Sequence, residues 1–231
     1  SLTGEAVWDD DVHVFANPDM DTLQGLKRIW TSGRAYYYPL TTTVFWLLHR
    51  QWGDDTFPYH LANLLIHIAN ALLLWRLLAR LKLPGAVLAA FIFALHPVQV
   101  ESVAWITELK NLLACFFFLL SAQSFVRSSY VPSLVFFILS LLSKPAAAGL
   151  PLLIPVYFWW KKRLLPIRKI FALSLPFFLV SLLAGLWTIW EQIVHSGAEG
   201  EVWSLSVLER FLVGGRAFWF YLEKFFWPVP V

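Results

Sequence analysis

The chain is poor in cysteine and in charge. It has one Cys among 231 residues, and Asp, Glu, Lys and Arg together make up only 14%. A single cysteine excludes a disulfide framework and a metal site built from several thiolates. So few charges, with 58% hydrophobic residues and a mean hydropathy of +0.62, lie far from the composition of a soluble domain. The composition therefore predicts an integral membrane protein whose partner is the lipid bilayer and not a nucleic acid.

Six apolar segments follow a polar and aromatic first part of the chain. Proline, glycine and charged residues separate them. They lie near 58–80, 84–97, 109–127, 131–143, 146–160 and 170–190. A straight span needs about 20 residues, so the shorter segments must extend into flanking polar sequence or pack as broken helices inside the protein. The pattern predicts an all-α, multi-span helical bundle.

The polar stretches set the predicted organisation. Residues 1–57 form a first extracytoplasmic loop, 58–190 a six-span transmembrane bundle, and 191–231 an outer loop with an amphipathic or interfacial helix. Two interfacial helices are expected within the first loop, near 19–31 and 40–52. The loop has no signal-peptide pattern, and we expect the chain to be a fragment that lacks an earlier span.

Basic residues gather on one predicted side of the membrane. If the first loop lies outside, the inner loops contain basic residues and no acidic ones, whereas every Asp and Glu falls on the outer side. The positive-inside rule predicts this bias. The inner basic residues are Arg76, Arg80, Lys82, Arg127, Lys161, Lys162, Arg163, Arg168 and Lys169.

Three consecutive carboxylates, Asp9, Asp10 and Asp11, follow Trp8 on the predicted outer face. Like charges held together at a membrane surface repel one another, which suggests a chemical role such as general acid–base catalysis. Helix capping and a solvated, calcium-like patch are the alternatives, so a divalent metal ion at this motif stays open.

Lys144 is the cation that most suggests a site. It interrupts an apolar stretch on the same predicted face, where it needs a carboxylate or a phosphate as a partner. Arg34 is a weaker candidate of the same kind, because a loop arginine is usually solvated. Glu101 lies in the loop that begins at His96. It is a site residue, an acid near a helix start, or a salt-bridge partner of Lys110.

A polar stripe runs down the first apolar segment. His60, Asn63, His67 and Asn70 are spaced by three, four and three residues, which puts them on one helical face. Polar atoms that face lipid are costly, so this face should point into the bundle. Interhelical hydrogen bonding is the favoured interpretation, ahead of a lipid-headgroup cavity and of metal or haem ligation.

Several motifs occur together in a fixed order. They are Trp8-Asp9-Asp10-Asp11, Asn17-Pro18-Asp19, Tyr38-Pro39-Leu40, His60 to His67, Phe93 to Val98, Glu101 to Trp105, Lys110-Asn111 and Leu142-Ser143-Lys144-Pro145. In this order they resemble the membrane half of the TMTC-like proteins, GT-C-type O-mannosyltransferase relatives that usually carry tetratricopeptide repeats after the membrane domain. The resemblance covers nearly the whole chain, and Trp-rich bacterial versions look most similar.

The resemblance implies a GT-C-like bundle that transfers a sugar from a polyprenyl-phosphate donor to a protein hydroxyl. Asp9 or Asp10 would be the base, and Lys144, with Arg34 as an outside candidate, would steady the leaving phosphate. The expected location is a bacterial inner membrane with the acidic loops on the periplasmic side. The further substrate-binding candidates are Asp11, His13, His60, His96 and Glu101.

Two functions from other classes stay open at this point. One is a non-catalytic, lipid-binding scaffold subunit of the membrane. The other is a transporter or flippase that uses the stripe from His60 to Asn70 as a polar path.

Overall fold

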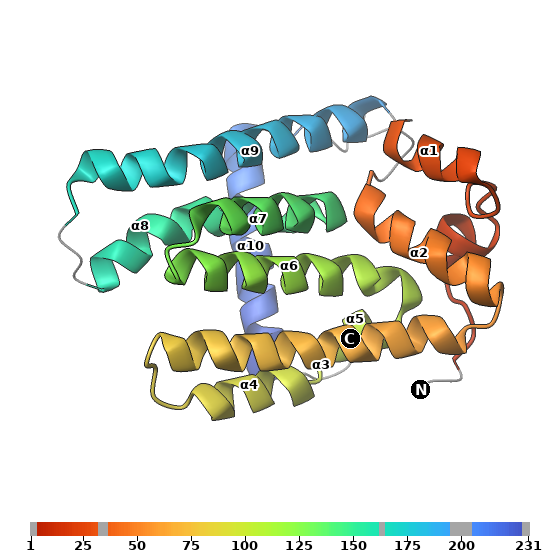
Figure 1. Cartoon of the computed structure of the whole chain (residues 1–231), viewed down its shortest axis with the longest axis horizontal. Helices are drawn as coiled ribbons and strands as arrows, with labels where there is room; N and C mark the ends of the chain where they lie inside the picture. The colour runs from red at the N-terminus through yellow and green to blue at the C-terminus, as the bar shows by residue number, and fades with distance from the viewer. Residues whose placement is uncertain (1–3, 32–36, 162–164, 195–204, 228–231) are drawn as a thin grey trace.

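A computed structural model describes residues 4–31, 37–161, 165–194 and 205–227 of the chain. This part of the chain is helical and contains no strand, so the predicted all-α fold is confirmed. The longer helices lie side by side, and one helix near the C-terminus runs across their direction (Figure 1). Their bounds are α1 Leu23–Thr31, α2 Pro39–Trp52, α3 Phe57–Arg80, α4 Ala86–Leu95, α5 Gln99–Ala104, α6 Leu109–Val126, α7 Tyr130–Ser143, α8 Leu150–Trp160, α9 Ile167–Val194 and α10 Val207–Phe226.

Proline and glycine fix several of the helix boundaries. Pro39 opens α2 from its first turn, where a missing N–H costs nothing. Gly85, with φ of +76°, forms the left-handed turn between α3 and α4. Pro145 opens a 3₁₀ turn, Pro145–Gly149, that separates α7 from α8. The two-helix interpretation of residues 130–160 is therefore what the structure contains.

Three helical stretches are long and apolar enough to cross a membrane. They are Phe57–Arg80, Ile106–Val126 and Ile167–Val194, and no membrane is present in the structure. Three shorter apolar helices, Ala86–Leu95, Tyr130–Ser143 and Pro145–Trp160, account for the other predicted segments. The fold is an all-α helical bundle of the membrane-protein type, whereas the division into six spans and flanking loops stays a prediction.

Two clusters of buried apolar side chains hold the bundle together. The first joins the N-terminal segment to the starts of α3 and α6, through residues that include Met20, Phe45, Tyr59 and Ile106. The second joins α6, α7, α8 and α9 around Phe137. Burial of each large apolar side chain contributes about 1.5–3 kcal/mol, so the first cluster fixes the N-terminal segment firmly against the bundle.

The two ends of the bundle carry opposite charge. The turns that join α3 to α4 and α6 to α7 lie at one end with the end of α8 and the start of α9, and α1, α2 and the start of α6 lie at the other (Figure 1). At the first end Lys161 Nζ donates to the backbone carbonyl of Leu81 at 2.8 Å, which links the end of α8 to the turn after α3 directly. The basic turns of the sequence are therefore close neighbours in space.

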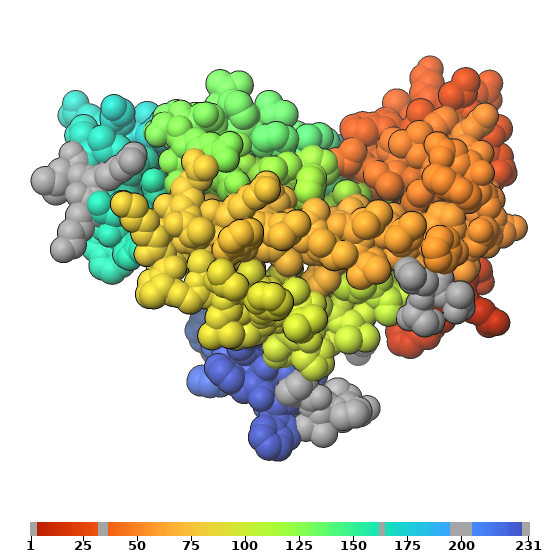
Figure 2. Space-filling view, turned by 60° about the horizontal axis from the view of Figure 1, so that its bottom comes forward, coloured from red at the N-terminus to blue at the C-terminus, as the bar shows by residue number. Residues whose placement is uncertain are grey.

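Helix α10 is exposed along its length and meets the bundle near its end, where the His96 and Phe225 rings stack with centroids 4.8 Å apart. It projects from the body of the bundle in Figure 2, and none of its residues is buried. A capping box starts it, in which Ser206 and Glu209 satisfy each other's backbone N–H groups. Its exposed apolar face is the amphipathic pattern that the sequence predicts for this region.

Candidate functional site

The acidic motif lies against the start of α6. Asp10 is fully buried at 0% exposure, and its two carboxylate oxygens each accept a backbone N–H, from Val7 at 3.0 Å and from Thr107 at 2.9 Å. The Thr107 hydroxyl donates to Asp9 Oδ1 at 2.8 Å. Thr107 is itself only 2% exposed, so one buried residue binds both carboxylates.

The two aspartates therefore occupy different environments. Both oxygens of Asp10 serve as acceptors for the backbone, which makes this carboxylate an anchor. The Asp9 side chain is 38% exposed, and its Oδ2 lies 3.5 Å from His13 Nε2. Asp9 thus keeps an oxygen on the open side of the site while Thr107 fixes the other. The sequence offered either residue as a base, and the geometry favours Asp9.

His13 faces this open oxygen from the turn that follows the motif. Burial lowers the pKa of its imidazole from the usual value of 6.5, against the opposing effect of Asp9. Lys110 lowers the same pKa further, and Asp10 raises it. The balance favours a neutral imidazole at pH 7, which can donate a hydrogen bond to Asp9 or accept one from a ligand.

A second group of polar side chains continues the site along α6. Glu108, 8% exposed, binds Lys110 through Oε1 at 2.8 Å and accepts a hydrogen bond from Asn111 Nδ2 through Oε2. Asn111 Oδ1 accepts a hydrogen bond from Lys144 Nζ at 2.6 Å. Lys144 enters from the turn between α7 and α8. The start of α6 therefore contacts both the acidic motif, through Thr107, and Lys144, through Asn111.

Lys144 is less basic than an ordinary lysine. Burial lowers its pKa from 10.5, Glu108 and Glu101 raise it, and Lys110 lowers it. The turn that carries Lys144 is fixed by a buried contact in which the Thr41 hydroxyl donates to the carbonyl of Ser143 at 3.0 Å. Two cations, Lys110 and Lys144, thus lie near the start of α6.

Some predicted site residues lie elsewhere. Asp11 is exposed on the first turn of the π-helix Asp11–Phe15. Glu101 is exposed in the first turn of α5, from which its charge still acts on Lys144, and Lys110 pairs with Glu108. Arg34 lies outside the described residues. Within the described ranges no three His, Cys, Asp or Glu side chains are grouped so that they could hold a metal ion.

The polar stripe of α3 forms the interhelical hydrogen bonds that the sequence favoured. Asn63 donates to the carbonyl of Trp105 at 2.8 Å, and Asn70 donates to the carbonyl of Leu112 at 2.9 Å. His67 Nε2 lies 3.0 Å from the carbonyl of Ala94. These bonds join α3 to α4 and to the start of α6, so the stripe stabilises the helix start that carries the site.

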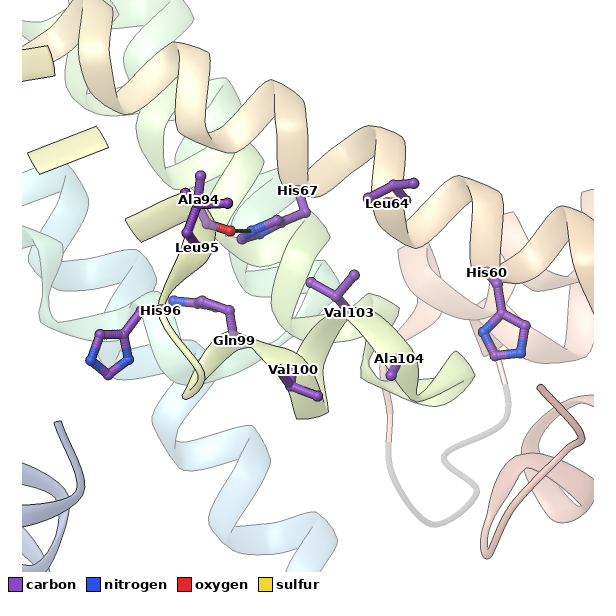
Figure 3. Close-up of a pocket in the computed structure, with 10 residues that line it drawn as sticks. All are labelled: His60, Leu64, His67, Ala94, Leu95, His96, Gln99, Val100, Val103 and Ala104. Carbon is purple, nitrogen blue, oxygen red and sulfur yellow. Dashed lines mark hydrogen bonds between the residues drawn. The ribbon is translucent and has the colours of Figure 1, made fainter. Parts of the chain in front are cut away.

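A groove of about 420 Å³ lies between α3, α4 and α5 (Figure 3). His60, His67 and His96 line it but do not converge, because His60 lies at one end and His96 beside Gln99 at the other. Each histidine Nε2 faces a backbone carbonyl, at 3.1 Å from Gly4 for His60 and at 2.8 Å from Phe225 for His96. The histidines therefore act as tethers between chain segments.

The fold and this site define a membrane helical bundle with a cluster of hydrogen-bonded polar and charged side chains at one end. The chain is 30% identical over 161 residues to a protein O-mannosyl-transferase of Caenorhabditis elegans, which covers 62% of the chain and 23% of that protein. It is 32% identical over 143 residues to protein O-mannosyl-transferase TMTC1 of Homo sapiens, covering 55% and 16%. It is 33% identical over 128 residues to TMTC2 of Mus musculus, covering 54% and 14%.

These similarities confirm the resemblance to the TMTC-like family that the motifs indicated. The chain spans less than a quarter of the length of these relatives. No family model and no solved structure matches it.

The sequence did not indicate that three further residues belong to the site. They are Thr107, Glu108 and Asn111, which connect the acidic motif, Lys110 and Lys144 to the start of α6. Each lies at the start of an apolar segment on the predicted outer face, close to the Lys110-Asn111 motif. That position was the available signal, because polar residues at the end of a span that face the acidic motif are candidates for the same site.

Proposed function

We propose that the chain is the membrane part of a glycosyltransferase that moves a sugar from a polyprenyl-phosphate-linked donor to a hydroxyl of a protein acceptor. The observation that carries the proposal is Asp9, a partly exposed carboxylate with one oxygen bound by Thr107 and the other facing His13 at 3.5 Å. The names of the relatives support the reaction class and a mannose-like sugar.

Asp9 acts as the general base. Its free oxygen takes the proton from the acceptor hydroxyl while the hydroxyl oxygen forms a bond to the anomeric carbon of the sugar. The bond from that carbon to the phosphate oxygen breaks, and polyprenyl phosphate leaves with the electron pair. Displacement from the opposite side inverts the anomeric centre.

Lys144 stabilises the leaving phosphate. Its ammonium is bound by Asn111, which in turn donates to Glu108. Glu108 also pairs with Lys110, so hydrogen bonds and an ion pair fix the position of the Lys144 charge. A fixed charge aimed at a developing negative charge lowers the barrier without reorganisation during the reaction. Without donor, the Lys144 ammonium donates a hydrogen bond to Asn111 Oδ1. The phosphate of the donor would replace Asn111 as the acceptor.

The site faces the extracytoplasmic side of the membrane, which we take to be the inner membrane of a bacterium. The basic turns at the opposite end of the bundle support this orientation, because such residues are retained in the cytoplasm. The donor's lipid chain remains in the bilayer, and the start of α6 places the reacting groups near its surface.

The test compares Asp9→Asn with the wild-type protein in native membranes. Polyprenyl-phosphate mannose and a protein acceptor are supplied, and both the acceptor mass and the free lipid phosphate are followed. Loss of a general base should reduce transfer by about 10²–10⁴-fold. Asp54→Asn, an exposed carboxylate in the turn between α2 and α3, is the matched control and should transfer normally.

Full transfer by Asp9→Asn would exclude Asp9 as the base. Donor binding without transfer, in the wild-type protein as well, would favour the lipid-binding scaffold. Transport along the stripe of α3 has less support, because His67 Nε2 and Asn70 Nδ2 already bind backbone carbonyls of neighbouring helices.

A further inference from the structure

Trp8, directly before the base, combines exposure with backbone strain. Its side chain is 87% exposed, and its φ is +55°, a region that L-residues with large side chains rarely adopt. A strained conformation persists only where the surroundings impose it, and such residues cluster at ligand sites. An exposed apolar ring alone would offer no reason to maintain this strain.

A second tryptophan fixes the position of the Trp8 ring. Trp105 meets it edge to face, with ring centroids 5.5 Å apart and planes at 75°. Trp105 is itself fixed, since Asn63 of α3 binds its carbonyl at 2.8 Å and Lys110 Nζ lies 5.6 Å from its ring centroid. Trp8 is therefore a rigid platform with a free face.

The platform lies beside the proposed base. Trp8 precedes Asp9, Trp105 precedes Thr107 by two residues, and Asp9 and Thr107 are hydrogen-bonded at 2.8 Å. The ring contact and this hydrogen bond thus join the same two segments of the chain. The Trp8 ring and the Asp9 carboxylate are therefore each fixed against the short stretch from Trp105 to Thr107.

We propose that Trp8 binds the apolar face of the pyranose ring of the transferred sugar, an inference that rests on the proposed function. A pyranose presents C–H groups on one face and hydroxyls around its edge. The electron-rich face of an indole attracts the C–H groups, and polar side chains at its margin bind the hydroxyls. The indole and the Asp9 carboxylate provide both kinds of contact within two consecutive residues.

The experiment compares Trp8→Gly, Trp8→Phe and the control Trp52→Ala with wild type in native membranes. Trp52 is an exposed tryptophan at the end of α2. For each variant we would measure the KM of transfer from polyprenyl-phosphate mannose, the binding of the sugar-free polyprenyl phosphate, and the thermal midpoint of unfolding. Glycine accepts a positive φ without strain, so Trp8→Gly removes the ring and relieves the backbone together.

The expected result separates binding from stability. Trp8→Gly should raise the KM of the sugar donor by about tenfold, the equivalent of a single ring contact. It should leave binding of the sugar-free lipid unchanged, and its thermal midpoint should not fall. Trp8→Phe should recover part of the KM, and Trp52→Ala should match wild type.

Other outcomes overturn the inference in distinguishable ways. If Trp8→Gly transfers sugar with an unchanged KM for the donor, Trp8 does not bind the sugar ring, and the proposed function still stands. Equal weakening of sugar-bearing and sugar-free lipid identifies Trp8 as a bilayer anchor, and a lower thermal midpoint identifies a structural residue. Absence of transfer and of sugar-dependent binding in the wild-type protein overturns the proposed function and the platform together.

Discussion

The backbone N–H of Thr107 donates to Asp10 Oδ1 at 2.9 Å, and this bond joins the first polar segment to the start of α6. The residues are separated by 97 positions in the sequence. The same carboxylate accepts the N–H of Val7, so it closes the local turn and fastens that turn to the bundle. Asp10 is therefore expected to determine where Asp9 lies.

Replacement of Asp10 by alanine should destabilise the protein. The change leaves the N–H groups of Val7 and Thr107 without their acceptor, and each unsatisfied group costs about 1–3 kcal/mol. We expect the free energy of unfolding to fall by about 2–4 kcal/mol. Thermal unfolding in lipid nanodiscs, compared with Asp11→Ala, is the measurement.

Asp11→Ala is a matched control because Asp11 is the exposed neighbour of Asp10. Its stability should stay within about 0.5 kcal/mol of wild type. Equal stability of the two variants would show that Asp10 is not the anchor.

The stripe of α3 allows a second stability prediction. Asn70 is fully buried and donates to the carbonyl of Leu112, so Asn70→Ala should reduce stability by about 1 kcal/mol, the usual value of an interhelical hydrogen bond in a membrane protein. Sugar transfer should persist at normal rates below the unfolding temperature. Leu72→Ala, on the exposed face of the same helix, should change stability little. A specific loss of transfer or transport in Asn70→Ala would contradict the structural role.

The helices could be predicted because their causes are local. Apolar runs bounded by proline, glycine or charge indicate where a membrane helix begins and ends, and α3 to α9 follow these signals. The inward face of α3 followed from the helical period of its polar residues. The opposite charge of the two ends followed from the division of Lys and Arg among the turns.

The inner structure of the site could not be predicted because it depends on contacts between distant segments. Asp9 and Asp10 look equivalent in the sequence, and only the packing of α6 gives one of them two backbone partners. Nothing in the sequence distinguishes Thr107 from other polar residues near a helix start, and only that packing shows that it binds both carboxylates. The sequence left a salt bridge between Glu101 and Lys110 open, and the observed pairing of Lys110 with Glu108 depends on the 3₁₀ turn Ile106–Glu108 before α6.

A close backbone approach at Gly25 leads to a prediction for the first segment. A Cβ added there would lie 2.6 Å from the carbonyl carbon of Asp19, whose side chain binds Arg28 at 2.6 Å. Backbone cannot move aside as a flexible side chain can, so Gly25→Ala should cost about 1–3 kcal/mol. Gly214→Ala in α10, where no atom lies within 4 Å of the added Cβ, should instead stabilise its helix by about 1 kcal/mol. Chemical denaturation of both variants tests the opposite signs, and a shared sign would refute the packing argument.

The lowered pKa of Lys144 predicts how transfer responds to alkaline pH. Burial favours the neutral amine, so the ammonium loses its proton below the usual value of 10.5 and transfer should fall as pH rises through that lowered pKa. Unfolding cannot explain the fall, because the unfolded chain binds more protons at this lysine between the lowered pKa and 10.5, and its contribution to stability therefore rises with pH. Lys144→Arg keeps its charge and should move the fall to higher pH, whereas Lys144→Met should transfer poorly at every pH. Rates normalised to each variant's maximum across pH 6 to 10 are the measurement, and an identical alkaline fall in wild type and Lys144→Arg would show that another group controls it.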